Sequence, residues 1–208
     1  MPSAHRCSRL PPGRAVVGCL WLLVGLLPLR AEGTGIGYFE AIRAEPGPVV
    51  GETYFLRHCV TCEHGVHETV NYSQGTVVPI NTKVILVERT SGGMVLRVEA
   101  TGEKITVRNV EKYSRRPMDV IARNMLTRAP VPIGKFGDGM AAQIASGRPV
   151  IGMTKEQVVM TRGYPPGHKT PSLDGDIWKY WASRMLWDTY AFENGILTSG
   201  SNLRRGGH

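Results

Sequence analysis

The chain has 208 residues, of which 42% are hydrophobic and 20% are charged. This length suits one or two globular domains, and the composition excludes a wholly disordered or fibrous protein. The formal net charge is +8, from 25 basic and 17 acidic residues. Four of the basic residues precede residue 32, so 21 remain beyond them against the same 17 acidic residues, which is a net charge of about +4. Because these 21 are scattered along the chain, the sequence does not indicate nucleic-acid binding.

The first 31 residues have the organisation of a secretory signal peptide. Arg6, Arg9 and Arg14 form a positive n-region, and residues 15–29 are an uninterrupted apolar run. That run is shorter than the roughly 20 residues of a membrane span and suits the core of a signal peptide. We therefore expect export and removal of residues 1–31, with an uncleaved N-terminal anchor as the alternative.

A small β-domain is predicted over residues 52–115, after a flexible lead-in over residues 32–51 that is rich in Gly and Pro. Short runs of β-branched and apolar residues recur in this domain, separated by turn signals, and their alternation is typical of half-buried strands. These runs are residues 54–56, 77–80, 83–88, 94–99 and 104–110. About five short antiparallel strands predict a small barrel of the SH3-like kind.

Residues 116–134 are predicted to form a helix followed by a proline-rich linker. Pro117 suits the first turn of a helix. Apolar residues then recur at the spacing of one helical face, at Met118, Ile121 and Met125. Residues 129–132, with two prolines, end the helix and predict a stiff connection.

Two further helices are predicted in residues 135–203. The first covers residues 136–146. The second begins at Thr154, which forms a capping box with Gln157, and it ends at Gly163, which precedes a tyrosine and two prolines.

An antiparallel sheet is predicted after these helices. Trp178 and Tyr180 alternate with Trp181 on a strand, so the first two are expected in the core and the third on the opposite face. Asn194 and Gly195 predict a two-residue type I′ hairpin, because both positions of that turn need a positive φ. The whole chain is therefore predicted to have an α+β fold.

The C-terminal pattern resembles the BamE-like (SmpA/OmlA) domain family. The residues that carry the resemblance are Gly152, Met153, Thr154, Gln157, Val158, Gly163, Pro165, Asn194 and Gly195. The resemblance implies two helices packed on a three-stranded antiparallel sheet over residues 135–203, with residues 204–208 as a tail. It also implies a Gram-negative envelope protein, since the best-known member is an accessory lipoprotein of the outer-membrane β-barrel assembly machinery.

A group of metal-ligand residue types lies in the predicted β-domain, at Cys59, Cys62, His64 and His67. A CxxC pair is a recurrent zinc knuckle, but the sequence has no second pair to complete a site. In an exported protein the cysteines can also form a local disulfide or remain inert thiols. Redox activity is a third alternative, without the βαβ context that usually accompanies it. The disulfide or inert-thiol interpretation is favoured, so no cofactor is expected, with zinc as the alternative.

Aromatic residues near the C-terminus are the candidate contacts for a partner. Trp181 points to the face opposite Trp178, and if Trp187 shares that face, the sheet presents an amphipathic patch suited to a protein or a lipid interface. Packing inside the protein is the favoured role for Trp181. Tyr164 and the adjacent Pro165 form a second candidate contact.

Signatures of the common catalytic classes, such as GxSxG, the P-loop, HExxH and GxGxxG, do not occur in the sequence. The favoured hypothesis is a non-enzymatic adaptor, periplasmic or membrane-associated, that binds envelope proteins such as outer-membrane assembly components and contacts the membrane surface. The alternative is a periplasmic metal-binding or thiol/disulfide protein that uses Cys59 and Cys62.

Overall fold

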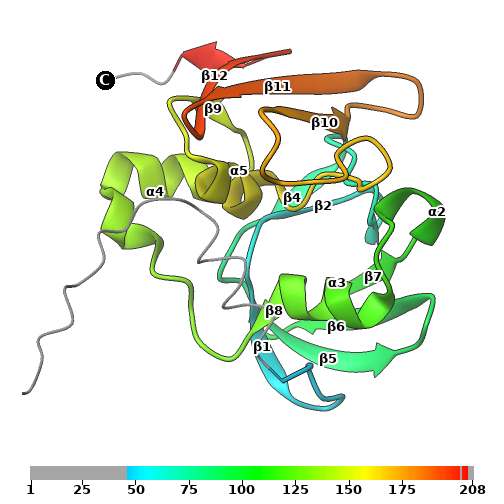
Figure 1. The fold of residues 1–208 in the computed structure, drawn as a ribbon. Coiled ribbons are helices and arrows are strands. Elements are labelled where there is room, and N and C mark those ends of the chain that lie inside the picture. The colour runs from blue at the N-terminus through cyan, green and yellow to red at the C-terminus, as the bar shows by residue number, and fades with distance from the viewer. Residues whose placement is uncertain (1–45, 202, 206–208) are drawn as a thin grey trace, which may run out of the picture. The chain divides into compact units, whose positions relative to one another are not determined.

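The computed structural model describes residues 46–201 and 203–205, which are coloured in Figure 1. Strands and helices are both present, so the predicted α+β fold is confirmed. The predicted signal peptide and residues 32–45 of the lead-in lie outside the described residues. All described residues belong to one compact unit.

Six strands form the largest sheet among the described residues, in the order β3-β7-β6-β5-β1-β8. Their bounds are β1 (Thr53–Leu56), β3 (Val66–Glu68), β5 (Lys83–Arg89), β6 (Gly93–Val98), β7 (Lys104–Arg108) and β8 (Leu126–Thr127). Strands β5, β6 and β7 form an antiparallel meander, as predicted, whereas β3 pairs with β7 in parallel. The expectation of purely antiparallel pairing is therefore wrong. Three residues are too few to show the alternation that would have revealed β3.

A second difference concerns the predicted strand at residues 77–80. It is present as β4 (Thr76–Val78), but it pairs with β2 (Val60–Cys62) in a separate two-stranded sheet. The run therefore forms a strand as its local sequence predicts. Its partner is β2, because the loop that carries β2 lies beside it.

The predicted helix in residues 116–134 is confirmed as α3 (Met118–Met125), which follows the single-turn α2 (Glu111–Ser114). Its apolar face completes the core of the six-stranded sheet, with buried residues Met118, Ile121, Ala122 and Met125. Facing them are buried side chains at alternate strand positions, among them Leu86, Leu96 and Val107. Each such side chain contributes about 1.5–3 kcal/mol by leaving water.

The C-terminal part contains two helices and an antiparallel sheet of order β10-β11-β12 (Figure 1). The elements are η1 (Ile133–Phe136), α4 (Asp138–Ala145), β9 (Val150–Ile151), α5 (Lys155–Arg162), β10 (Ile177–Trp181), β11 (Trp187–Glu193), β12 (Ile196–Gly200) and β13 (Arg204–Arg205). The capping box of α5 is confirmed, with Thr154 Oγ1 accepting from the Gln157 amide (3.2 Å) and Gln157 Oε1 accepting from the Thr154 amide (2.8 Å). Asn194 and Gly195 have φ of 51° and 78° between β11 and β12, as the predicted turn requires.

Residues of the predicted β-domain enter the second core as well. Cys59 donates its amide to the Met160 carbonyl (2.9 Å) and its thiol to the Ile144 carbonyl (3.2 Å). The side chain of Asn81 makes two hydrogen bonds to the backbone of Val131 (2.9 and 2.7 Å), within the proline-rich linker. These contacts fix the linker and the helices α4 and α5 against loops of the β-rich part.

Gly163 at the end of α5 should not tolerate a side chain. Its φ of 80° and ψ of −175° lie in a region that is essentially restricted to glycine and costs other residues about 1–3 kcal/mol. A Cβ would also lie 2.7 Å from Asn71 Nδ2 and 3.0 Å from the His58 ring. Gly163→Ala is therefore expected to lower the free energy of unfolding in urea by at least about 1–3 kcal/mol.

Gly139→Ala is the matched control, because a Cβ at this position inside α4 meets no atom within 4 Å. It should leave the stability unchanged or raise it by up to about 1 kcal/mol. Equal unfolding curves for Gly163→Ala and the unmodified chain would contradict the constraint described for this turn.

Candidate functional site

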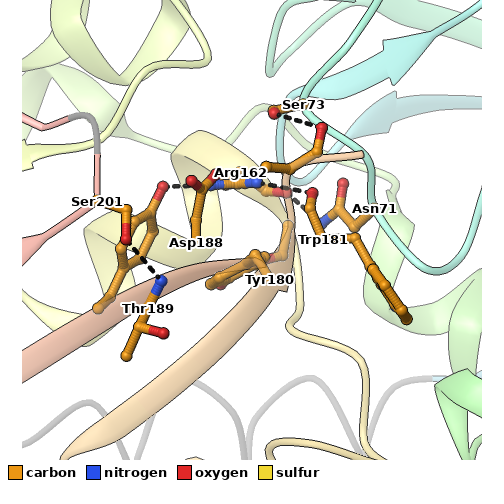
Figure 2. A network of polar contacts seen from close by, with 11 residues as sticks. Asn71, Ser73, Arg162, Tyr180, Trp181, Asp188, Thr189 and Ser201 are labelled. Carbon is orange, nitrogen blue, oxygen red and sulfur yellow. Dashed lines mark hydrogen bonds and ion pairs between the residues drawn. The ribbon is translucent and has the colours of Figure 1, made fainter. Parts of the chain in front are cut away.

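A buried ion pair joins the C-terminal end of α5 to the β10–β11 hairpin (Figure 2). Arg162, the last residue of α5, places Nη1 2.8 Å from Asp188 Oδ2, with both side chains buried. The same nitrogen donates to the Tyr190 hydroxyl, and Nη2 donates to the Trp181 carbonyl (3.0 Å). A buried charge without a partner costs several kcal/mol, so separating Arg162 from these groups is unfavourable. The contacts therefore hold the end of the helix against both strands of the hairpin.

Aromatic rings enclose the guanidinium. Its central carbon lies 4.7 Å from the ring centroid of Tyr180 and 5.4 Å from that of Tyr190. Burial opposes the charge of Arg162, yet the neighbouring Tyr190 and Asp188 raise its pKa, so the group stays charged. The Tyr180 hydroxyl donates to the Gly163 carbonyl (2.9 Å), and burial raises its pKa well above the usual range.

Asn71, in a loop of the β-rich part, contacts the end of α5 beside the buried ion pair (Figure 2). Its side-chain amide donates to the carbonyl of Arg162 and to that of Tyr164 (3.3 Å). Asn71 has a φ of 64°, a conformation that asparagine adopts more readily than most residues. The last turn of α5 is thus held by a loop about ninety residues earlier in the chain.

Trp181 and Trp187 lie directly opposite each other on β10 and β11, so they share a face of the sheet. Their ring centroids are 3.4 Å apart and the ring planes are tilted by 30°. Both side chains are half-buried, whereas Trp178 and Tyr180 on the other face are fully buried, as predicted.

His168 joins the two tryptophans to the β-rich part. Its ring centroid lies 6.0 Å from Trp181, 5.5 Å from Trp187 and 4.9 Å from Tyr113. Trp181 also contacts Tyr113 (6.1 Å) and Tyr72 (6.4 Å). We call these five residues the aromatic cluster. Trp181 therefore has the internal packing role that was favoured for it, and Trp187 lies further along the same stack.

The exposed surface next to the aromatic cluster is apolar, and both basic and acidic residues lie around it, since Met185 and Arg184 line a recess that Glu63 and Glu68 also line. Met185 and Leu186, in the turn between β10 and β11, are 87% and 65% exposed. Lys169 lies 5.5 Å above the ring of Trp187, and Arg184 is exposed in the same turn. Trp187, Met185 and Leu186 together are named the tryptophan surface below.

Tyr164 and Pro165 do not belong to this surface. Pro165 is buried, and its carbonyl accepts from Arg116 (3.2 Å). The Tyr164 ring packs edge-on against His58 (6.2 Å) and beneath the Arg116 guanidinium (5.3 Å). Both residues help to hold α5 against the β-rich part, so the structure does not present Pro165 to a partner as the sequence suggested.

The four residues predicted as a disulfide or metal site do not converge. Cys59 is buried in the C-terminal core and Cys62 in the core of the six-stranded sheet, and both are free thiols. His64 is exposed in a turn, while His67 is buried with Nδ1 3.0 Å from the Thr61 carbonyl. Within residues 46–201 and 203–205, no three His, Cys, Asp or Glu side chains are grouped to hold a metal ion.

Burial also makes both thiols poor nucleophiles. It raises the pKa of Cys59, and it raises that of Cys62 to about 11, so the reactive thiolate is scarce near neutral pH. Of the alternatives drawn from the sequence, the structure corresponds to two inert thiols and not to a local disulfide.

Sequence reasoning missed Asn71, Arg162, His168 and Asp188 as functional residues. One signal was present for Asp188, which lies two residues before Tyr190 and therefore on the buried face of its strand. A buried carboxylate needs a cationic partner or hydrogen-bond donors, although the pattern does not say which residues supply them. The roles of Asn71 and His168 depend on loops that meet only in the folded chain.

No family model matches the chain, and neither a curated protein nor a solved structure matches it. Among the helices of the described residues, none has the length and apolar character needed to cross a bilayer.

Removing one member of the buried pair should be strongly destabilising. Asp188→Ala is expected to lower the free energy of unfolding in urea by about 3–5 kcal/mol, because Arg162 keeps a buried charge. The double variant Arg162→Met with Asp188→Leu should lose less than the sum of the single changes, since no charge remains.

Glu99→Ala is the control for that series. Glu99 pairs with Lys83 at 2.8 Å, but both side chains are more than 40% exposed, so its loss should cost less than about 1 kcal/mol. Equal losses for Asp188→Ala and Glu99→Ala would contradict the importance given to the buried pair.

His58 should make the stability depend on pH. It is buried beside a small cavity that is also lined by His67 and Asn71, and burial lowers its pKa from 6.5 to about 4. The unfolded chain binds this proton below about pH 6.5 and the folded chain only near pH 4. Stability that is complete above pH 6.5 is therefore lost as the pH falls toward 4, by up to about 3 kcal/mol.

Urea unfolding of His58→Gln between about pH 7 and pH 4.5 tests this expectation. The variant should lose less stability on acidification than the unmodified chain. Part of the effect should remain, because burial also lowers the pKa of His67. The same pH dependence in both proteins would show that His58 does not contribute.

Proposed function

We propose that this protein is a non-enzymatic adaptor of a Gram-negative envelope, which binds another protein through the tryptophan surface. The observation that carries the proposal is the closely packed pair Trp181 and Trp187 beside the exposed Met185 and Leu186. Tryptophan and methionine are enriched at the centres of protein interfaces. An isolated exposed leucine needs no explanation, whereas an apolar turn continuous with a half-buried tryptophan pair is typical of a binding surface.

The rigidity of the support strengthens this interpretation. Arg162 and Asp188 are fixed beneath the hairpin, and the Trp181 carbonyl accepts from the arginine. A partner would therefore meet aromatic rings that are already ordered, which reduces the entropy lost on association.

The finer fold assignments are part of the same proposal. We assign residues 135–203 to the BamE-like kind, because α4 and α5 occur there with a three-stranded antiparallel sheet. We assign the β-rich part, with its β5–β6–β7 meander, to the SH3-like kind. The resemblance and the signal-peptide pattern support export, a periplasmic or membrane-associated location, and partners among outer-membrane assembly or envelope-maintenance proteins.

The alternative of a metal-binding or thiol/disulfide protein has less support. Cys59 and Cys62 belong to different cores, and burial raises the pKa of each thiol. Neither arrangement favours zinc binding or disulfide exchange.

Affinity capture from gently solubilised envelopes tests the adaptor proposal. A C-terminally tagged chain should recover envelope proteins, and Met185→Ser with Leu186→Ser should reduce that recovery severalfold by removing exposed apolar area. The fold should be unaffected, because both side chains lie mainly in solvent.

The matched control is Val49→Ser with Val50→Ser, which removes two apolar side chains that are each 50% exposed in the turn before β1. Its recovery should equal that of the unmodified chain. A preparation with no stable partner, or with near-stoichiometric zinc in the same purified sample, would contradict the adaptor proposal.

A further inference from the structure

A recess of about 380 Å³ lies beside the aromatic cluster, where α2 meets the loop before β10. Its lining residues are Ser114, Arg115, Arg116, Gly167, His168 and Pro171. The amides of Gly167 and His168 donate to the last carbonyls of α2, those of Ser114 (3.3 Å) and Tyr113 (3.1 Å). A Cβ at Gly167 would lie 2.6 Å from the Ser114 carbonyl oxygen, so the close approach that forms the recess depends on this glycine.

The recess is electropositive. Arg115 lines it and is exposed, the exposed Lys169 follows the lining residue His168 in the chain, and Lys112 lies one helical turn before Arg115. Burial lowers the pKa of His168, and the nearby charges of Lys169 and Arg115 lower it further. Glu111 is the acidic residue of α2, and no ion pair among the described residues joins it to these cations.

The positive recess is continuous with the tryptophan surface. His168 lines the recess and also contacts Trp187 (5.5 Å), while Lys169 lies over the same indole (5.5 Å). A ligand with carboxylates in the recess could therefore place a neighbouring apolar group against Trp187. Arginine suits this task because its planar guanidinium can bind a carboxylate through two hydrogen bonds.

We propose that this recess binds an acidic segment of the partner protein, with an adjacent apolar side chain against the tryptophan surface. The inference rests on the proposed adaptor function and names the chemistry of its partner. A peptide is favoured over a membrane because the cations border a concave recess, which a protruding chain can enter and a flat bilayer cannot.

Fluorescence anisotropy with a labelled synthetic peptide, four glutamates followed by two leucines, tests the proposal on the purified chain. The peptide should bind, and the same peptide with glutamines in place of the glutamates should bind at least about tenfold more weakly. Arg115→Glu with Lys169→Glu should also weaken binding of the glutamate peptide by about tenfold or more. The control is Arg97→Glu with Lys104→Glu, an exposed cross-strand pair on β6 and β7 that gives the same change in net charge; it should leave binding unchanged.

Equal binding of the two peptides, or equal loss in the two charge-reversed variants, would overturn the proposal. Binding to phosphatidylglycerol vesicles without binding to the glutamate peptide would also overturn it, in favour of a membrane. Capture of a partner that persists in the Arg115→Glu, Lys169→Glu variant would overturn this inference and leave the adaptor function in place. Failure of the unmodified chain to capture any partner would instead count against the adaptor function.

Discussion

The buried pair of Arg162 and Asp188 is the interaction on which the functional surface depends. It joins the end of α5 to the β10–β11 hairpin, and the same arginine binds the Trp181 carbonyl. The carbonyl of Arg162 in turn accepts from Asn71, which belongs to the β-rich part. One residue thus connects the helix, the sheet and a distant loop, and Trp181 is held by the same group of contacts.

A buried ion pair is a poor source of stability, because the cost of removing two charges from water offsets most of their attraction. Its value in this protein is orientation. The guanidinium donates hydrogen bonds to Asp188, Tyr190 and the Trp181 carbonyl, and only one orientation of it satisfies all three. Apolar side chains at the same place could pack in several orientations. We attribute the fixed, tilted arrangement of the two tryptophans to this constraint. A surface fixed in advance suits an adaptor, whose role is to present one shape to its partner.

Local chemistry made part of this structure predictable. The capping box at Thr154, the asparagine-glycine turn at residues 194–195 and the alternation of Trp178 with Tyr180 each depend on neighbouring residues. The parallel pairing of β3, the position of His168 in the aromatic cluster and the hydrogen bonds of Asn71 depend on segments far apart in the chain. The CxxC spacing was misleading for the same reason, because a loop and a short strand direct Cys59 and Cys62 into different cores.

Circular dichroism of the tryptophan pair tests the central claim most directly, because two indoles held close together at a fixed angle couple and give paired bands of opposite sign. The unmodified chain should show this couplet, and Trp187→Phe should abolish it and so identify its source. Asp188→Asn keeps the size of the side chain but removes its charge, and we predict a weakened couplet under conditions where that variant remains folded. An undiminished couplet in Asp188→Asn would contradict the claim that the buried pair holds the tryptophans in place.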